Sequence, residues 1–303
     1  MEFTFLLNNS SVISQVTAVT ATEVSSLHSM YWYRSEHAKK EISAFMDTGH
    51  EPFSMDIDEK LTTQHYFGHA AVDYALSLLQ LPPSAYVLDA GAGMGAVSRY
   101  LVHKNPNSSV LSVDINSDFI EIAKYLTTQL GGFEGRLIHV AEDLLTIKTD
   151  VLFDAVISFL CFLHIEDKDA LFGSLSNVMK LNGRMYFEDF ISPDSPVSAE
   201  SAAQLMKYVS CPLLLPKDAY IAALESHGFQ ILSFEDVTDI WSEFTETRAA
   251  KYRSELPQHV ALHGDEIANA YLDFYFNMAE LFQQRAVVGV RVLVQKKEQP
   301  VVT

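Results

Sequence analysis

Val87-Leu88-Asp89-Ala90-Gly91-Ala92-Gly93-Met94-Gly95 is the stretch that decides the fold of this chain. An apolar run over 85–90 leads directly into glycines at alternate positions, and a helical pattern follows to residue 104. Glycine permits a tight turn and lets the backbone come close to a ligand at a helix N-terminus. The stretch therefore predicts a strand, a glycine turn and a helix, with a ligand bound above the turn.

Six further apolar runs after this stretch are typical of strands, and most are separated by helical patterns. Continuous apolar strands between helices indicate a mostly parallel sheet that is covered on both faces. We therefore predict an α/β fold with a Rossmann-like, seven-stranded, mostly parallel sheet. The predicted strands span 85–90, 108–115, 136–140, 153–159, 184–190, 229–237 and 286–295.

The predicted organisation has four parts. Residues 1–64 form an N-terminal helical lid segment, with a helix over 27–47 and a polar break over 48–60. A core domain spans 65–195. Residues 196–285 form a mainly helical insertion that contributes one core strand near 229–237, and 286–303 supply the last strand and a tail. We expect the insertion to lie over the carboxyl ends of the strands, where open α/β folds bind ligands.

Composition excludes several classes of protein. The chain has 303 residues, 48% of them hydrophobic, and carries 21 Lys and Arg against 39 Asp and Glu, a net charge of −18. This acidity argues against nucleic-acid binding and against anionic membrane surfaces. The two cysteines form no disulfide framework. With no targeting signal and no apolar run long enough to cross a membrane, we expect a cytoplasmic protein.

Three acidic residues at successive strand ends indicate which ligand binds. Asp89 stands two residues before Gly91, where its carboxylate would repel the pyrophosphate of a dinucleotide and attract an ammonium group. Asp114 ends the next strand, where a carboxylate can accept hydrogen bonds from ribose hydroxyls, and Asp143 follows the third strand. S-adenosylmethionine has both a ribose and a cationic amino-acid end. The pattern favours this cofactor, and an NAD-dependent oxidoreductase remains the alternative.

These motifs resemble those of the class I S-adenosylmethionine-dependent methyltransferases. The similarity covers roughly 65–190 and returns at the last strand: VLDAGAGMG resembles the first family motif, VDI (113–115) the second, and EDL (142–144) the adenine loop. The resemblance implies that Asp89 and the glycines hold the methionine end, Asp114 the ribose, and Ile115 and Asp143 the adenine. The full set of implied cofactor contacts is Tyr66, Asp89, Gly91, Gly93, Gly95, Asp114, Ile115, Asp143, Leu144 and Ser158.

Two further features resemble a subgroup, the small-amine N-methyltransferases that act on phosphoethanolamine, sarcosine or dimethylglycine. One is Phe162-Leu163-His164, and the other is a helical insertion containing Trp241. Phe190 stands where the phosphobase enzymes have a Tyr, and YVSCPLL (208–214) replaces their phosphate-binding residues, which argues against phosphoethanolamine. The resemblance implies a small-molecule acceptor, with an amine nitrogen favoured.

Methyl transfer to an amine needs an unprotonated nucleophile, so a base or a desolvated pocket must assist. His164 is the candidate base, because it lies just past the carboxyl end of the fourth strand. Tyr31 and Tyr33 are candidates for a lid helix whose aromatic faces would attract a methylammonium group. The alternative for both tyrosines is ordinary aromatic packing.

Other polar residues near the predicted ligand edge are weaker candidates. Tyr66 and His69 are expected near the carboxylate of the cofactor, and Glu188 and Asp189 could neutralise a cationic substrate. His65 and His69 stand four residues apart, as do His259 and His263, but no cysteine or HExxH-type glutamate completes either ligand set. We therefore predict no metal site.

The predicted function is S-adenosylmethionine-dependent methylation of a small-molecule acceptor, most simply an amine. An O- or C-methyltransferase and a catalytically inactive, cofactor-binding partner subunit are the alternatives. We expect no nucleic-acid or membrane partner, and a monomer or a homodimer.

Overall fold

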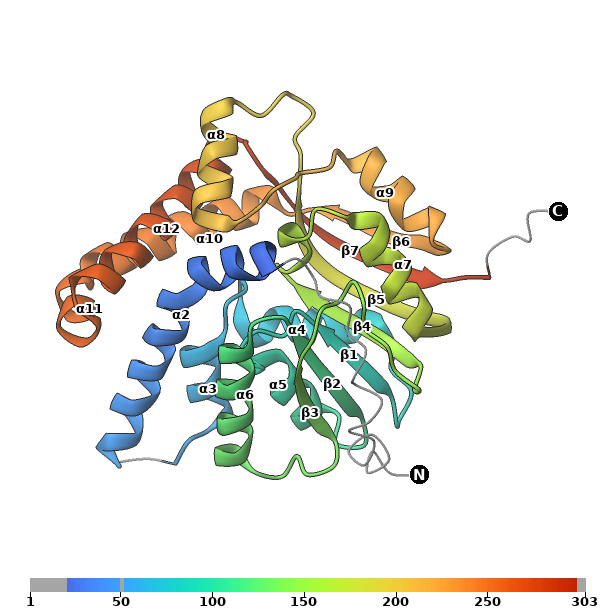
Figure 1. Ribbon diagram of the computed structural model, residues 1–303, viewed down its shortest axis with the longest axis horizontal. Coiled ribbons are helices and arrows are strands. Elements are labelled where there is room, and N and C mark those ends of the chain that lie inside the picture. The colour runs from blue at the N-terminus through green and yellow to red at the C-terminus, as the bar shows by residue number, and fades with distance from the viewer. Residues whose placement is uncertain (1–20, 50–51, 299–303) are drawn as a thin grey trace.

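The computed structural model describes residues 21–49 and 52–298 and has a seven-stranded sheet at its centre (Figure 1). The strand order is β3-β2-β1-β4-β5-β7-β6. Strands β1 to β5 pair in parallel, and β7 lies antiparallel between β5 and β6. The predicted fold class is confirmed. The strands are β1 Tyr86–Ala90, β2 Ser109–Asp114, β3 Leu137–Ala141, β4 Phe153–Phe159, β5 Met179–Ile191, β6 Phe229–Asp236 and β7 Val288–Lys296.

Helices cover both faces of the sheet because alternate strand residues point to opposite sides. Val87 packs in a core with residues of α4 and α5, whereas Leu88 packs in a second core with residues of α7 and α9. Helix α6 lies beside α5, and the Asn116 side chain caps its first turn. The helices are α4 Gly68–Leu79, α5 Ala96–Lys104, α6 Ser117–Leu130, α7 Lys168–Val178 and α9 Lys217–Ser226.

A helical cap follows β5 in the chain, as predicted, and returns to the sheet through β6 and β7 (Figure 1). Trp241 of the cap helix α10 is fully buried between the cap and the sheet. A Cβ at Gly289 of β7 would lie 2.2 Å from the Trp241 ring, so this strand position admits only glycine. The cap elements are α8 Ala199–Gln204, a π-helical turn Leu205–Val209, α10 Thr238–Ser254, α11 Leu256–His263 and α12 Asp265–Gln283.

The lid segment begins with helix α2 (Ala21–Thr48), which covers the predicted helix at 27–47. The predicted polar break over 48–60 is wrong in part, because α3 (Met55–Thr62) starts within it behind the N-cap residue Ser54. Asp58 is fully buried there and binds the equally buried guanidinium of Arg99 through two hydrogen bonds of 2.6 and 2.7 Å. The first 20 residues of the predicted lid segment lie outside the described residues, and the domain boundaries remain a prediction.

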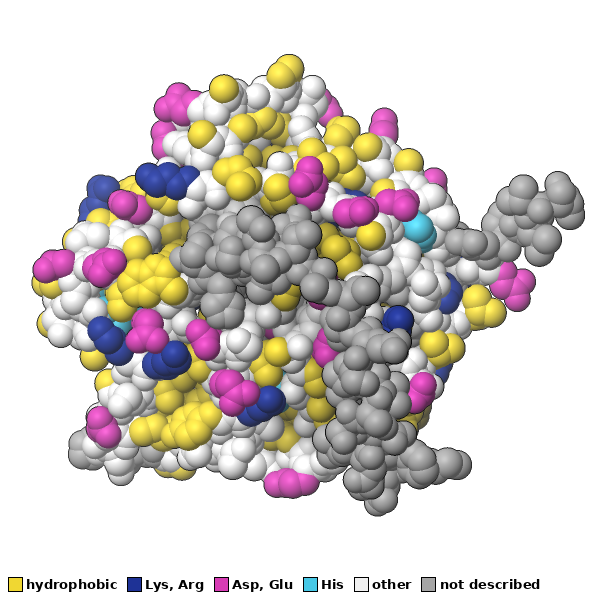
Figure 2. Space-filling view, in the orientation of Figure 1, with side chains coloured by type: hydrophobic (Ala, Val, Ile, Leu, Met, Phe, Trp, Pro, Cys, Tyr) yellow, Lys and Arg dark blue, Asp and Glu magenta, His cyan; other side chains and the backbone are white. Residues whose placement is uncertain are grey.

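The surface agrees with the acidic composition. On the face seen in Figure 2, Lys and Arg side chains are scattered among Asp and Glu rather than gathered into one basic patch. In the described part of the chain, no helix is both long enough and apolar enough to cross a bilayer.

Candidate active site

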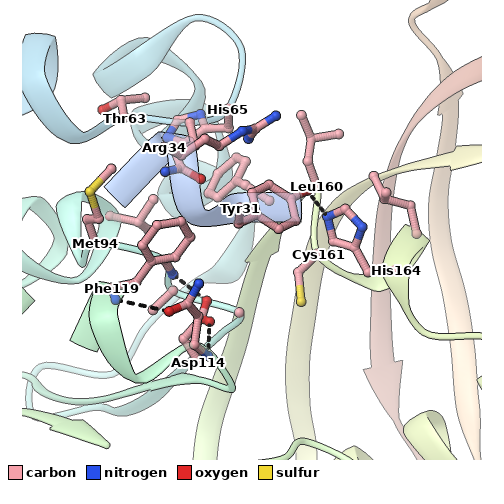
Figure 3. Close-up of a pocket in the computed structure, with 18 of the residues that line it drawn as sticks. Tyr31, Arg34, Thr63, His65, Met94, Asp114, Phe119, Leu160, Cys161 and His164 are labelled. Carbon is pink, nitrogen blue, oxygen red and sulfur yellow. Dashed lines mark hydrogen bonds between the residues drawn. The ribbon is translucent and has the colours of Figure 1, made fainter. Parts of the chain in front are cut away.

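The carboxyl ends of the parallel strands bring the predicted ligand residues to one edge of the sheet. Asp89 lies near the end of β1, Asp114 ends β2, and Asp143 follows β3. His164 ends a short 3₁₀ turn, Phe162–His164, just after β4. All four line one pocket, which α2 and the cap helices cover (Figure 3).

The glycine turn has the backbone conformation that its sequence predicts. Gly91, Gly93 and Gly95 have φ values of 74°, 53° and 79°. A Cβ at Gly91 would lie 2.1 Å from the sulfur of Cys161, whereas at Gly93 it would meet no atom within 4 Å. Gly93 therefore faces open space in the pocket. Gly95 does not line the pocket and instead allows close packing at the start of α5.

Asp114 organises this turn as well as facing the pocket. Its carboxylate accepts hydrogen bonds from the backbone N–H of Gly93 at 2.7 Å and of Asn116 at 2.8 Å. Burial raises its pKa, and the two backbone donors partly offset this shift. Each carboxylate oxygen has a second lone pair, so Asp114 retains acceptor capacity for a ligand.

Asp89 is buried and accepts a hydrogen bond from the Ser98 hydroxyl at 2.5 Å. Burial raises the pKa of Asp89 to about 7, with the Asp114 charge adding to the effect and Ser98 opposing it. A ligand ammonium group at this place would stabilise the ionised carboxylate. Ile115 and Leu144 line the pocket between these acids, and Asp143 accepts from the backbone N–H of Leu145.

Tyr31 reaches the site from α2 and joins His164 (Figure 3). The Tyr31 oxygen lies 2.8 Å from His164 Nε2, and His164 Nδ1 lies 3.2 Å from the Ser210 carbonyl oxygen. A carbonyl only accepts, so Nδ1 carries the proton and Nε2 accepts the Tyr31 O–H. The two residues form one dyad between the lid helix and the sheet edge.

Burial lowers the pKa of His164 to about 4 and raises that of Tyr31, so the dyad is uncharged near neutral pH. Because the pKa of His164 is lowered, its imidazole takes up a proton only as the pH falls towards 4, not at the ordinary value of about 6.5. We expect an NMR titration, with His164→Gln identifying the resonance, to show a neutral ring down to about pH 5. A midpoint near 6.5 would contradict this burial.

Two arginines that the sequence analysis missed also line the pocket. Arg34 is buried with its guanidinium 4.5 Å from the Tyr31 ring centroid and 4.4 Å from that of Phe274. Arg248 lies 4.4 Å from the ring centroid of Tyr275, and its Nε and Nη2 atoms are buried with no hydrogen-bond partner among the described residues. Two guanidinium groups at one pocket wall, one of them with buried donors that have no partner, suit an anionic ligand.

Several predicted residues lie elsewhere. Tyr33, two residues after Tyr31, packs edge-on against Tyr271 and does not line the pocket. Ser158 is buried and donates to the Ala90 carbonyl at 2.7 Å. His69 stacks on Tyr100, outside the pocket. Tyr66 does line it, as does His65, which was not predicted there.

The two acids at the end of β5 are also absent from the pocket lining. Glu188 accepts hydrogen bonds from Arg291 and Tyr186, both at 2.9 Å, and Asp189 accepts one from Tyr220 at 2.5 Å. Both carboxyl groups are buried, each with one oxygen held by these partners and the other without a hydrogen-bond partner among the described residues. The expectation that they meet a cationic substrate is therefore wrong.

The structure brings potential ligands from another helix to His259 and His263, which sequence spacing alone did not indicate, and the prediction of no metal site stays a prediction. His37 and Glu41 of α2 lie next to them, and one ligand atom from each residue falls within 4.8 Å of the others. The pair His65 and His69 belongs to no such group in the described residues.

Comparison with known proteins agrees with this geometry. Residues 88–185 match the family model of a methyltransferase domain. The chain is 27% identical over 191 residues to the phosphoethanolamine N-methyltransferase of Triticum aestivum, covering 63% of this chain and 37% of that protein. It is 29% identical over 162 residues to the sarcosine/dimethylglycine N-methyltransferase of Halorhodospira halochloris, covering 52% and 56%.

Among solved structures, the chain resembles phosphoethanolamine N-methyltransferase 2 of Haemonchus contortus, crystallised with phosphomonomethylethanolamine and S-adenosylhomocysteine. The TM-score is 0.68 at 16% identity, covering 77% of this chain and 53% of that one. The fold thus matches the Rossmann-like fold of the class I methyltransferases, and residues 88–185 match a methyltransferase domain. It spans only 37% and 56% of the two curated relatives.

Proposed function

We propose that this chain is an S-adenosylmethionine-dependent methyltransferase whose acceptor is a small molecule carrying both an amine and an anionic group. The observation that carries the proposal is the composition of the two pocket walls. Carboxylates at successive strand ends form the wall at the sheet, and Arg34 and Arg248 stand on the lid and cap side. The first wall suits the cofactor, and the second suits an acceptor of opposite charge.

The described residues fit the cofactor. Gly93 opens onto free space, Asp114 has acceptor capacity for ribose hydroxyls, and a cation beside buried Asp89 would favour its ionised form. Ile115 and Leu144 supply apolar contacts for the adenine ring. Bound in this way, S-adenosylmethionine would supply an electrophilic methyl group.

The two arginines support an anionic acceptor. Arg34 is buried, Arg248 is half-buried with its Nε and Nη2 atoms out of contact with solvent, and within the described residues neither forms an ion pair that would consume its charge. A carboxylate or a phosphate would satisfy their donors and neutralise them. The relatives named above act on phosphoethanolamine and on sarcosine or dimethylglycine, each of which joins an anionic group to an amine.

The dyad would prepare the amine. Tyr31 donates a hydrogen bond to His164, so its phenol oxygen can accept a hydrogen bond from an N–H of the acceptor amine and orient the nitrogen lone pair. As the amine loses that proton to the phenol oxygen, Tyr31 would pass its own proton to His164. The desolvation that lowers the pKa of His164 also disfavours an ammonium form of the acceptor in the same pocket. Lid, imidazole and burial together would thus keep the nitrogen nucleophilic.

A methyl-transfer assay tests this function. The full chain would be incubated with methyl-labelled S-adenosylmethionine and with sarcosine, phosphoethanolamine, a neutral amine, a phenol or a prenyl diphosphate. We expect transfer to an amine with an anionic group and little to the neutral amine. Transfer to the phenol or prenyl diphosphate alone would support O- or C-methylation, and no transfer to any acceptor would favour a non-catalytic cofactor-binding subunit. Either result contradicts the proposal.

The dyad gives a sharper prediction. Tyr31→Phe removes the hydroxyl that contacts His164 and is expected to lower kcat about 10²–10⁴-fold, the usual contribution of proton transfer by a positioned side chain. Tyr33→Phe is the matched control, because Tyr33 is on the same helix but outside the pocket. Equal kcat values for the two variants would remove Tyr31 from the mechanism.

A further inference from the structure

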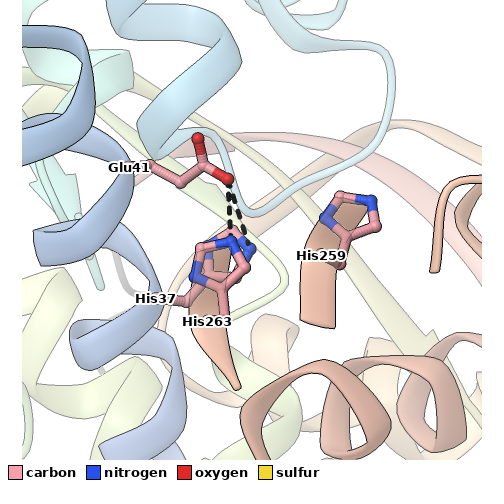
Figure 4. Close-up of side chains that lie close together, drawn as sticks. All are labelled: His37, Glu41, His259 and His263. Atoms are coloured by element: carbon pink, nitrogen blue, oxygen red, sulfur yellow. Dashed lines mark hydrogen bonds and ion pairs between the residues drawn. The ribbon is translucent and has the colours of Figure 1, made fainter. Parts of the chain in front are cut away.

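Four potential metal ligands meet where the lid helix α2 crosses the cap helix α11, outside the pocket described above. His37 and Glu41 are one turn apart on α2, and His259 and His263 are one turn apart on α11 (Figure 4). One ligand atom from each residue lies within 4.8 Å of the other three. Two helices that are more than 200 residues apart in sequence thus each present a pair of ligands to the same point.

Two of the three histidines in this cluster have a buried ring nitrogen without a hydrogen-bond partner among the described residues. Glu41 Oε1 lies 2.9 Å from His263 Nε2 and 3.9 Å from His37 Nε2. The side chain of His263 is fully buried, yet its Nδ1 atom has no hydrogen-bond partner in the part of the chain that the structure describes. His259 is partly exposed, but its Nε2 atom is buried and also has no hydrogen-bond partner there, since the nearest Glu255 oxygen lies 3.9 Å away. Buried polar atoms normally have partners, so these two require an explanation.

We propose that His37, Glu41, His259 and His263 form a binding site for a zinc-type divalent metal that joins the lid helix to the cap. Three imidazoles and one carboxylate are a tetrahedral donor set suited to zinc, whereas magnesium and calcium prefer all-oxygen sites. Zinc–nitrogen bonds of about 2.0–2.1 Å place tetrahedral ligand atoms roughly 3.3 Å apart. The two contacts to Glu41, of 2.9 and 3.9 Å, bracket that separation, and metal binding would draw the other ligand atoms in from within 4.8 Å of one another.

The site would act on the position of the lid. Helix α2 also carries Tyr31 and Arg34, which reach the pocket two turns or less before His37. Lys40 Nζ already donates to the His263 carbonyl at 2.9 Å, so the two helices are in contact at this crossing. A bound metal would cross-link α2 to α11 and hold Tyr31 against His164.

The test is zinc binding by the full chain after chelator treatment and dialysis, with no cofactor or acceptor present. We expect one Zn²⁺ per chain in competition with a chromogenic chelator, a rise of several degrees in Tm, and the absorption of tetrahedral Co²⁺ when cobalt replaces zinc. His37→Gln and His259→Gln should each bind zinc at least tenfold more weakly. The exposed His103→Gln is the matched control and should bind like the parent.

Circular dichroism and S-adenosylhomocysteine binding would establish that each variant is folded, and Glu41→Gln replaces any variant that is not. If the untreated and chelator-treated chains bind no zinc at one equivalent, the proposal fails. It also fails if folded variants of the cluster bind zinc as tightly as His103→Gln does. Neither result bears on the methyltransferase assignment, because the binding assay uses no methyl donor or acceptor.

Discussion

Asp114→Ala is expected to weaken the binding of S-adenosylhomocysteine about 10²–10⁴-fold. Hydrogen bonds to a charged group contribute about 1.5–3 kcal/mol each, and the carboxylate would accept one from each of two ribose hydroxyls. The substitution also removes the acceptor that holds the backbone N–H of Gly93 at 2.7 Å, so the glycine turn loses its support. Isothermal titration calorimetry measures the change.

Glu121→Gln is the control for this variant, because Glu121 lies exposed on the adjacent helix α6 and pairs only with Lys124 among the described residues. Its dissociation constant should equal that of the parent. Asp114→Asn keeps the side-chain shape but loses the charge and one acceptor, and should fall between the parent and Asp114→Ala. A dissociation constant for Asp114→Ala close to the parent value would show that this strand end does not bind the nucleoside.

Asp58→Ala is expected to lower the free energy of unfolding by about 3–5 kcal/mol, because it leaves a buried guanidinium without its partner. Asp58 and Arg99 are both fully buried and share two short hydrogen bonds. Among the residues that the structure describes, Arg99 otherwise donates only to Thr62 and the Ala123 carbonyl, both at 3.3 Å. Urea unfolding followed by circular dichroism measures the loss.

The double variant Asp58→Leu/Arg99→Met removes both charges and should recover most of that stability. Glu121→Gln disrupts a solvent-exposed pair and should leave the unfolding midpoint unchanged. If Asp58→Ala is no less stable than Glu121→Gln, the α3–α5 ion pair does not hold the lid segment to the core.

The sequence predicts the sheet and one wall of the pocket well because both follow from local patterns. Each apolar run is bounded by turn residues, and parallel strands deliver their carboxyl ends to one edge. Asp89 and Asp114 could therefore be placed without coordinates. Asn182 adopts a left-handed φ of 63°, a conformation that Asn tolerates better than most residues.

The residues that were missed depend on contacts between distant segments. Arg34 had a local signal, since it lies one turn after Tyr31 on the same helix face. Arg248 had none, because its place at the pocket is set by packing of the cap over the sheet. Asp58 lies in the predicted polar break over 48–60, and nothing local indicates that it is buried, because its partner Arg99 is 41 positions away.

The metal ligands illustrate the same limit. His259 and His263 have ligand spacing, and so do His37 and Glu41, but each pair alone is an incomplete set. Only the crossing of α2 and α11 brings the four together. Tyr33 shows the converse, because a residue two positions from Tyr31 points to a different side of the helix and packs on Tyr271 instead.

The most direct test of the account compares two ligands on the unmodified chain by calorimetry and thermal shift. We expect S-adenosylhomocysteine to bind at one site per chain. At about 100 times its dissociation constant it should raise the free energy of unfolding by about 2.7 kcal/mol. We expect NADH to do neither, because a pyrophosphate beside Asp89 would either be repelled by the ionised carboxylate or force this buried group to take up a proton. Stabilisation by NADH, or no binding of S-adenosylhomocysteine, would contradict the assignment of a methyl donor to this pocket.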